Sequence, residues 1–321
     1  MDKRLLNVLR VVVSAGLLAF VLWTNDAATI WRELRQSDVR YLLAALTLYI
    51  LSLVIRAYRW LVLIRGLGPD VSFGRLVNLY FIGQFFSTFL PTTYGGDVVR
   101  ALELTEDTES SAAVGTVLLD RLTGLMMLAL IGLIVLPFQL SRIDRWLVLL
   151  LLGLMLAVLV GGTLLIEGRL LRRMTSRLPS KLSLVGQGPL AKVYAAVTGC
   201  GWRAVVQAFG VSIVFNIVNV VINWLCGRAM ATGISLGFFF AISTLFSIAG
   251  LIPSIGGWGV RETLSTAVFG SVDAEKAAAW GIALNLVLLA AGLVGGGVYL
   301  VGSALNIIAE RRGTGETPPV R

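Results

Sequence analysis

The sequence predicts an all-α, polytopic integral membrane protein, and three observations lead to this class. Hydrophobic residues make up 57% of the 321 residues and charged residues only 14%, with a mean hydropathy of +0.85. A soluble globular domain carries about 25% charged residues, so this chain cannot cover a water-facing exterior. Apolar windows long enough to cross about 30 Å of hydrocarbon predict six full transmembrane helices, near residues 5–24, 41–64, 112–137, 146–167, 203–226 and 277–308.

The first window, 5–24, follows Lys3 and Arg4 and superficially resembles a secretion signal. A run of about 20 apolar residues is long for a signal, and no small-x-small cleavage site closes it. We therefore expect it to be retained as the first transmembrane helix. Residues 27–36, which follow it, are expected to lie flat on the outer face of the membrane.

Two further apolar segments, 73–90 and 236–252, each stop directly before a proline. Proline removes a backbone donor and disfavours helix at the preceding residue. A glycine-rich turn follows each proline, and then comes a short helical stretch at 97–104 or 258–269. These stretches would be about 12 and 18 Å long, too short to cross. Each proline-glycine unit therefore predicts a re-entrant hairpin that enters and leaves on one side.

Charge predicts how these segments are oriented. The loop at 168–203 carries seven basic residues and no acidic residue, which places it in the cytoplasm. With both hairpins re-entrant, both termini are also cytoplasmic, and the two hairpins enter from opposite sides. Their sequences are alike, FLPTTYGGDVVRALEL at 89–104 and LIPSIGGWGVRETLS at 251–265. This pattern predicts an inverted repeat with a site near the midplane. One transmembrane domain would span 1–310, followed by a short cytoplasmic tail at 311–321.

The composition excludes several chemistries. The chain has no histidine, which excludes Ser-His-Asp triads, histidine-liganded zinc and the usual pH switch. Cys200 and Cys226 show no metal or redox spacing and are expected to be packing residues, so we expect no metal and no cofactor. The net charge is +9, but the basic residues flank apolar runs. They indicate topology signals and contacts to anionic membrane lipids, among them a basic interfacial helix at 169–181, and not nucleic acid.

The two turns are the first candidate site. Backbone that is not helical at membrane depth must be buried in protein or line a wet cavity. Glycines let the backbone approach a ligand, and the start of the following helix offers free N–H groups to an anion such as phosphate. The same glycines would also permit tight turns and close helix packing, and both interpretations stay open. The candidate positions are Gly95, Gly96, Gly256, Gly257 and Gly259.

Charged residues beside the turns favour a functional site. Asp97 and Arg100 share one face of the first short helix, and Arg261 and Glu262 occupy the matching place in the second. Ionisable groups at membrane depth cost roughly 2.5 to 3.5 kcal/mol each and are usually functional or paired. The alternatives are an N-cap for Asp97 and purely structural pairing for the others.

Asp120 and Arg121 lie inside the third predicted crossing. Adjacent helical positions point about 100° apart, so each residue needs its own partner. We expect Asp120 to pair with Arg100, and Arg121 to pair with Asp97 or with the substrate. The alternative is an ion-pair lock between helices.

Two other polar groups have competing interpretations. Arg56 and Arg59 close the second crossing, where snorkelling to the inner headgroups is the favoured interpretation and admission of a lipid phosphate the alternative. Asn216, Asn219 and Asn223 form an amide stripe on one face of the fifth crossing. Helix-helix hydrogen bonding explains that stripe as well as substrate contact does.

The motifs PTTYGGDVVR, LLDRLTGL and IPSIGGWGVRE resemble those of the flippase-like membrane domain of the lysylphosphatidylglycerol synthase family, and with the hydropathy profile the resemblance covers about residues 5–308. It implies a multi-helix domain that moves a lipid between leaflets. Carried over by motif, it implies a substrate path along Gly95, Gly96, Asp97 and Arg100, then Asp120 and Arg121, then Gly256, Gly257, Gly259 and Glu262. Synthase members continue into a soluble aminoacyl-transfer domain, which is missing here, so we do not expect this chain to make the aminoacyl lipid.

The favoured function is that of a translocase, not an enzyme, in the cytoplasmic membrane, with a phospholipid or a polyprenyl-phosphate-type lipid as partner. The alternatives are a membrane-embedded lipid-modifying transferase, with a catalytic carboxylate at a headgroup-level cleft, and a small-solute secondary transporter with a closed central site. Association into a homo-oligomer stays open.

Overall fold

The computed structural model describes residues 27–89, 95–141, 143–176, 183–250, 252, 254, 257–269 and 273–313. These residues form twelve α-helices and one 3-10 turn, and contain no β-strand. The helices are α2 (Ala27–Arg35), α3 (Val39–Leu67), α4 (Phe73–Phe89), α5 (Gly95–Leu104), α6 (Ser110–Val135), α7 (Arg145–Glu167), α8 (Arg169–Thr175), α9 (Pro189–Gly199), α10 (Gly201–Ala229), α11 (Leu236–Ala249), α12 (Val260–Val268) and α13 (Ala274–Gly313), with the 3-10 turn at Leu136–Gln139.

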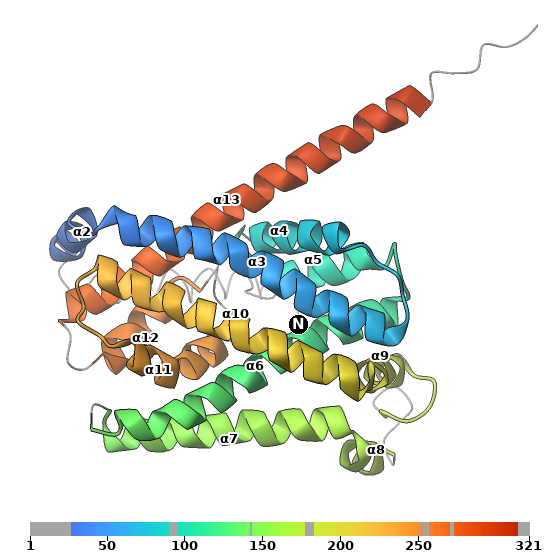
Figure 1. Cartoon of the computed structure of the whole chain (residues 1–321), viewed down its shortest axis with the longest axis horizontal. Coiled ribbons are helices and arrows are strands. Elements are labelled where there is room, and N and C mark those ends of the chain that lie inside the picture. Colours follow the sequence, from blue (N-terminus) through green and yellow to red (C-terminus); the bar gives the residue numbers. More distant parts are fainter. Residues whose placement is uncertain are drawn as a thin grey trace, which may run out of the picture.

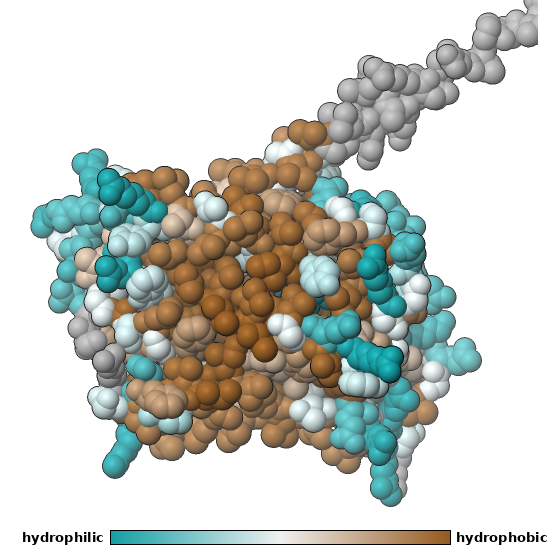
Figure 2. All heavy atoms as spheres, viewed as in Figure 1, coloured by the Kyte–Doolittle hydropathy of each residue, from teal (hydrophilic) through white to brown (hydrophobic). Residues whose placement is uncertain are grey.

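Five of the described helices are long and apolar enough to cross a membrane. They are α3, α6, α7, α10 and α13, and they confirm five of the six predicted crossings. The remaining window, 5–24, lies outside the described residues. Figure 2 shows an apolar belt across the middle of the molecule, flanked on two opposite sides by polar groups. The chain is therefore an all-α, polytopic membrane protein.

Local sequence sets the ends of these helices. Asp38 caps α3 by accepting a hydrogen bond from the backbone N–H of Arg40 at 2.9 Å. At the other end, Gly68 adopts φ 106°, a left-handed conformation that favours glycine after a helix. Gly168 ends α7 in the same way, with φ 75°. Ser235 caps α11 through its hydroxyl, which accepts from the N–H of Phe238 at 3.3 Å.

The helices that carry the site are tightly packed. α3 and α10 run side by side, and α6 packs against α10, α7 and α11 (Figure 1). One buried cluster joins α10, α11 and α13 around Trp280, Phe239 and Phe269. A second cluster joins α3, α4, α5 and α6 around Trp60 and Tyr80. Members of both clusters, such as Tyr80 and Leu284, line the cavity described below.

The two proline-glycine units form separate helix pairs. α4 and α5 pack against each other near the end of the molecule where α3 finishes, whereas α11 and α12 lie toward the opposite end (Figure 1). α4 has 17 residues and α11 has 14, or about 26 and 21 Å, shorter than a full crossing. α4 ends at Phe89 and α11 at Ala249, close to the predicted ends of the two apolar segments, while both prolines lie outside the described residues. Re-entry and an inverted repeat stay predictions.

The basic segment 168–203 is not a simple loop. It contains α8, which covers the first half of the predicted interfacial helix at 169–181, and also α9. Pro189 starts α9 after Gly188, since proline is favoured in the first turn of a helix. Residues 27–35 form α2, and the position of this segment on the outer face of the membrane stays a prediction.

Candidate functional site

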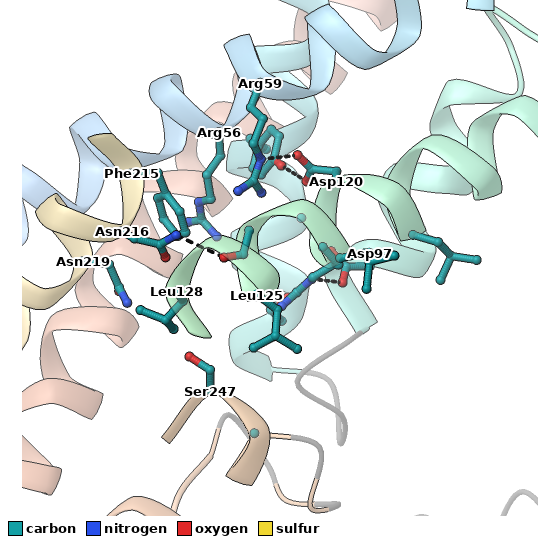
Figure 3. A pocket seen from close by; sticks show the side chains of 18 of the residues that line it. Arg56, Arg59, Asp97, Asp120, Leu125, Leu128, Phe215, Asn216, Asn219 and Ser247 are labelled. Carbon is teal, nitrogen blue, oxygen red and sulfur yellow. Dashed lines mark hydrogen bonds and ion pairs between the residues drawn. The ribbon is translucent and has the colours of Figure 1, made fainter. Parts of the chain in front are cut away.

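A cavity of about 670 Å³ lies inside the helix bundle. Its wall takes residues from α3, α4, α5, α6, α7, α9, α10, α11, α12 and α13. Figure 3 shows Arg56 and Arg59 entering it from α3, with Ser247 of α11 on another wall. The charged residues of the described wall are five arginines and two aspartates, Arg56, Arg59, Asp97, Arg100, Asp120, Arg121 and Arg261. The formal excess is three positive charges.

Asp120 is the centre of a buried network that joins five helices, α3, α4, α5, α6 and α10. Its Oδ1 accepts a hydrogen bond from Arg59 Nε at 2.7 Å, and its Oδ2 accepts one from the hydroxyl of Tyr80. Arg100 Nη2 lies 3.8 Å from the same Oδ2, and Arg59 Nη1 also donates to Ser212 Oγ at 3.1 Å. The predicted partner, Arg100, is therefore present but more distant than Arg59.

The snorkelling interpretation is wrong for Arg59. Its side chain is only 3% exposed, and Gly124 of α6 makes room for it, because a Cβ there would lie 2.5 Å from Arg59 Nη1. The guanidinium thus points into the bundle and ties α3 to α6 and α10.

Asp97 joins α5 to α6 and is bound by two arginines. Its Oδ1 accepts from Arg100 Nη2 at 2.6 Å, and its Oδ2 accepts from Arg121 Nε at 2.5 Å. The expected pairing of Arg121 with Asp97 is confirmed, and Asp120 and Arg121 do take separate partners. The N-cap alternative for Asp97 does not hold, because α5 begins two residues earlier, at Gly95.

Arg100 is held by rings as well as by carboxylates. Its guanidinium carbon lies 3.9 Å from the ring centre of Tyr80 and 4.8 Å from that of Trp60. Such cation–π contacts stabilise a desolvated cation by about 2 kcal/mol. The residue is 3% exposed, so Arg100 is largely fixed in place.

In the second unit, Asn285 of α13 connects the two charged residues of α12. Arg261 donates from Nη1 to Asn285 Oδ1, and Asn285 Nδ2 donates to Glu262 Oε1 at 2.8 Å. Glu262 Oε2 accepts from the backbone N–H of Gly259 at 2.8 Å, which closes the first turn of α12. Arg261 lines the cavity, whereas the fully buried Glu262 does not reach its described wall.

The glycines serve packing and turn geometry. A Cβ on Gly96 would collide with the carbonyl of Gly83 and the hydroxyl of Ser87, so this position lets α5 lie directly on α4. Gly257 and Gly259 adopt φ 85° and 82°, a region that L side chains rarely enter. Gly95 is buried in the first turn of α5, and Gly256 lies outside the described residues.

Uncharged polar groups complete the wall. The amide stripe of α10 both packs and lines the cavity: Asn216 Nδ2 donates to the carbonyl of Gly124 at 3.0 Å, and Asn223 Nδ2 donates to that of Asn219 at 2.7 Å. Sequence reasoning did not single out Tyr80, Gln84 or Asn285. An isolated amide in an apolar window, as at position 285, is a detectable signal, because such a group needs a partner in the membrane.

Comparison with known proteins identifies the family. Residues 7–296 match the family model described as the lysylphosphatidylglycerol synthase TM region. The UPF0104 membrane protein PH1989 of Pyrococcus horikoshii is 24% identical over 156 residues, which are 47% of this chain and 46% of that protein. The aligned region thus spans about half the length of this relative. Because the family model covers most of the chain, the protein belongs to the lysylphosphatidylglycerol synthase transmembrane family.

Proposed function

We propose that this member of the family is a lipid translocase that moves a phosphate-bearing lipid between the leaflets of the cytoplasmic membrane. The observation that carries this proposal is the excess of three positive charges in the cavity wall. Unneutralised charge is costly at membrane depth, and an arginine fork matches phosphate oxygens.

The size of the cavity supports a headgroup as the bound part. Ligand pockets typically have volumes of about 300–1,000 Å³, and this one has about 670 Å³. Apolar residues of α6 and α13, such as Leu125, Leu128 and Leu288, lie in the same wall as the arginines. In the proposed mechanism the phosphate enters among the arginines while the acyl chains stay in the bilayer.

The helix pairs provide the proposed moving parts. α5 is tied to α6 through Asp97 and Arg121, and α12 is tied to α13 through Glu262 and Asn285. A phosphate that binds Arg100 would compete with Asp120 of α6, whose Oδ2 lies 3.8 Å from Arg100 Nη2, and would loosen the contact between α5 and α6. At the other end, a phosphate on Arg261 would compete with Asn285. Alternate loosening of the two pairs, as re-entrant hairpins on opposite sides, would pass the headgroup across the membrane.

Transport in reconstituted vesicles tests the proposal. A fluorescent phosphate lipid placed in one leaflet should reach the other leaflet, where a membrane-impermeant quencher detects it. The rate of this transfer should rise with the amount of protein in the vesicles. Arg100→Lys and Arg261→Lys keep the charge but lose the bidentate fork, so both should slow transport. Arg65→Lys, at the exposed end of α3, is the matched control. Wild-type transport in both test variants would remove these arginines from the path, and no transport by the wild-type protein would refute the proposal.

A further inference from the structure

Arg56 has no carboxylate within 4.0 Å among the described residues. Its Nε and Nη2 are buried and find no hydrogen-bond partner in the described part of the chain. Three rings surround the guanidinium, with centres 5.7 Å away for Tyr49 and 5.4 Å away for both Tyr80 and Phe215. The rings hold the cation but leave its N–H donors without acceptors. Since buried donors are normally satisfied, these donors indicate a site for an anion.

The neighbouring arginines contrast with Arg56. Arg59 pairs with Asp120, and Arg100 and Arg121 both pair with Asp97. An anion that binds any of these three must compete with an existing carboxylate. Arg56 requires no such exchange, although it lines the same cavity, so it is the favoured first contact.

The aspartates of the described wall are already occupied. Asp97 accepts from Arg100 through one oxygen and from Arg121 through the other. Asp120 accepts from Arg59 and from Tyr80 in the same way. An ammonium-bearing headgroup would have to break these pairs and would also meet the excess of positive charge. The wall therefore disfavours a cationic headgroup.

The uncharged part of the wall suits hydroxyl groups. An amide offers both a donor and an acceptor, as a hydroxyl does, and serine and threonine hydroxyls add further groups of both kinds. The amide side chains in the wall are Gln84, Asn216, Asn219, Asn223 and Asn285, and the serine and threonine hydroxyls are Ser87, Thr88, Ser243 and Ser247.

From these contacts we infer that the cavity selects a phosphate lipid with an uncharged, hydroxyl-rich headgroup, that Arg56 binds the phosphate, and that the amides of α10 bind the hydroxyls. The inference deepens the proposed function and rests on it for a phosphate lipid as the substrate. Glycerol or sugar attached to the phosphate has this chemistry, whereas a lysine ester does not.

Lipid binding to the purified full-length protein, measured by native mass spectrometry in detergent, tests the inference. Phosphatidylglycerol should bind most tightly, phosphatidic acid, which lacks the headgroup hydroxyls, less tightly, and lysyl-phosphatidylglycerol least. Arg56→Gln should weaken binding of the first two lipids about tenfold or more, as loss of a charge-assisted bidentate contact does. Arg56→Lys should fall between Arg56→Gln and wild type, and Arg65→Gln, on the same helix but exposed, should match wild type.

Asn219→Leu separates the two halves of the inference, because it should weaken phosphatidylglycerol binding and leave phosphatidic acid binding unchanged. Binding by Arg56→Gln within twofold of wild type, in a variant that stays monodisperse, would overturn the role of Arg56. Equal binding of lysyl-phosphatidylglycerol and phosphatidylglycerol would overturn the headgroup selection. If the expected binding order holds and vesicles show no transport, the proposed function fails while the binding site stands.

Discussion

Replacement of Asp120 by asparagine should be among the most destabilising single changes in this protein. The substitution nearly preserves side-chain volume and removes one negative charge from a site that is 1% exposed. It weakens the 2.7 Å bond from Arg59 and the bond from Tyr80, and it leaves Arg100, 3.8 Å away, without part of its neutralising charge.

The magnitude follows from these contacts. Hydrogen bonds to charged groups contribute about 1.5–3 kcal/mol each, and removal of one partner of a buried ion pair costs about 3–5 kcal/mol because a buried charge remains. We expect a loss of about 3–5 kcal/mol for Asp120→Asn. Glu106→Gln is the matched control, since Glu106 pairs with Arg75 at 2.9 Å but is 72% exposed. An exposed pair contributes about 0–1 kcal/mol.

Reversible unfolding in mixed micelles of a mild detergent and SDS, followed by circular dichroism, measures both variants. The double variant Arg59→Met with Asp120→Leu adds an internal check. Removal of both charges should recover at least about 1 kcal/mol relative to Asp120→Asn, because buried pairs can often be replaced by apolar groups. Asp120→Asn no less stable than Glu106→Gln would refute the reasoning that this network stabilises the bundle.

Three further predictions concern packing and reactivity. Gly96→Ala should destabilise the protein by about 1–3 kcal/mol, because the added Cβ would collide with the backbone of α4. The control Gly153→Ala has open space around it and should be neutral or stabilising in the same unfolding assay. Equal losses of stability in the two variants would contradict the packing argument. Asn285→Leu should cost about 1–3 kcal/mol because it removes a donor from the buried carboxylate of Glu262; wild-type stability would show that this bond is dispensable. Burial raises the pKa of the Cys200 thiol to about 11, so little of the reactive thiolate is present at pH 7. Peptide-level maleimide labelling at this pH should therefore be slow in the folded protein and complete in SDS. Rapid labelling of the folded protein would show an accessible thiolate.

The sequence predicted best those features that depend on residues close together in the chain. Proline and glycine predicted the helix breaks, and the short helix predicted at 97–104 begins two residues earlier, at Gly95. Adjacent helical residues cannot share a partner, which predicted separate partners for Asp120 and Arg121. These results depend on backbone sterics and helix geometry, both of which are local.

Long-range contacts were harder to predict. The partner of Arg59 is 61 residues away and depends on how α3 crosses α6, which no hydropathy window contains. The position of Arg59 near the end of the second predicted crossing suggested snorkelling, yet Gly124, which has no Cβ, leaves room for the guanidinium inside the bundle. The apolar window that contains Asn285 signals only that this amide needs a partner, because which partner it takes depends on the packing of α12 against α13.

The arrangement of charge connects stability with the proposed function. An unpaired charged side chain in an apolar belt destabilises the folded protein. A bundle selected only for stability would therefore neutralise every arginine or replace it. Two aspartates neutralise Arg59, Arg100 and Arg121, whereas the partly buried Arg56 lies among aromatic rings and has no carboxylate within 4.0 Å in the described part of the chain. The pairs hold α3, α5 and α6 together, whereas Nε and Nη2 of Arg56 have no hydrogen-bond partner among the described residues. Under the proposed function, an anionic headgroup would supply the partner that Arg56 lacks, so a bound ligand should stabilise the protein mainly through Arg56.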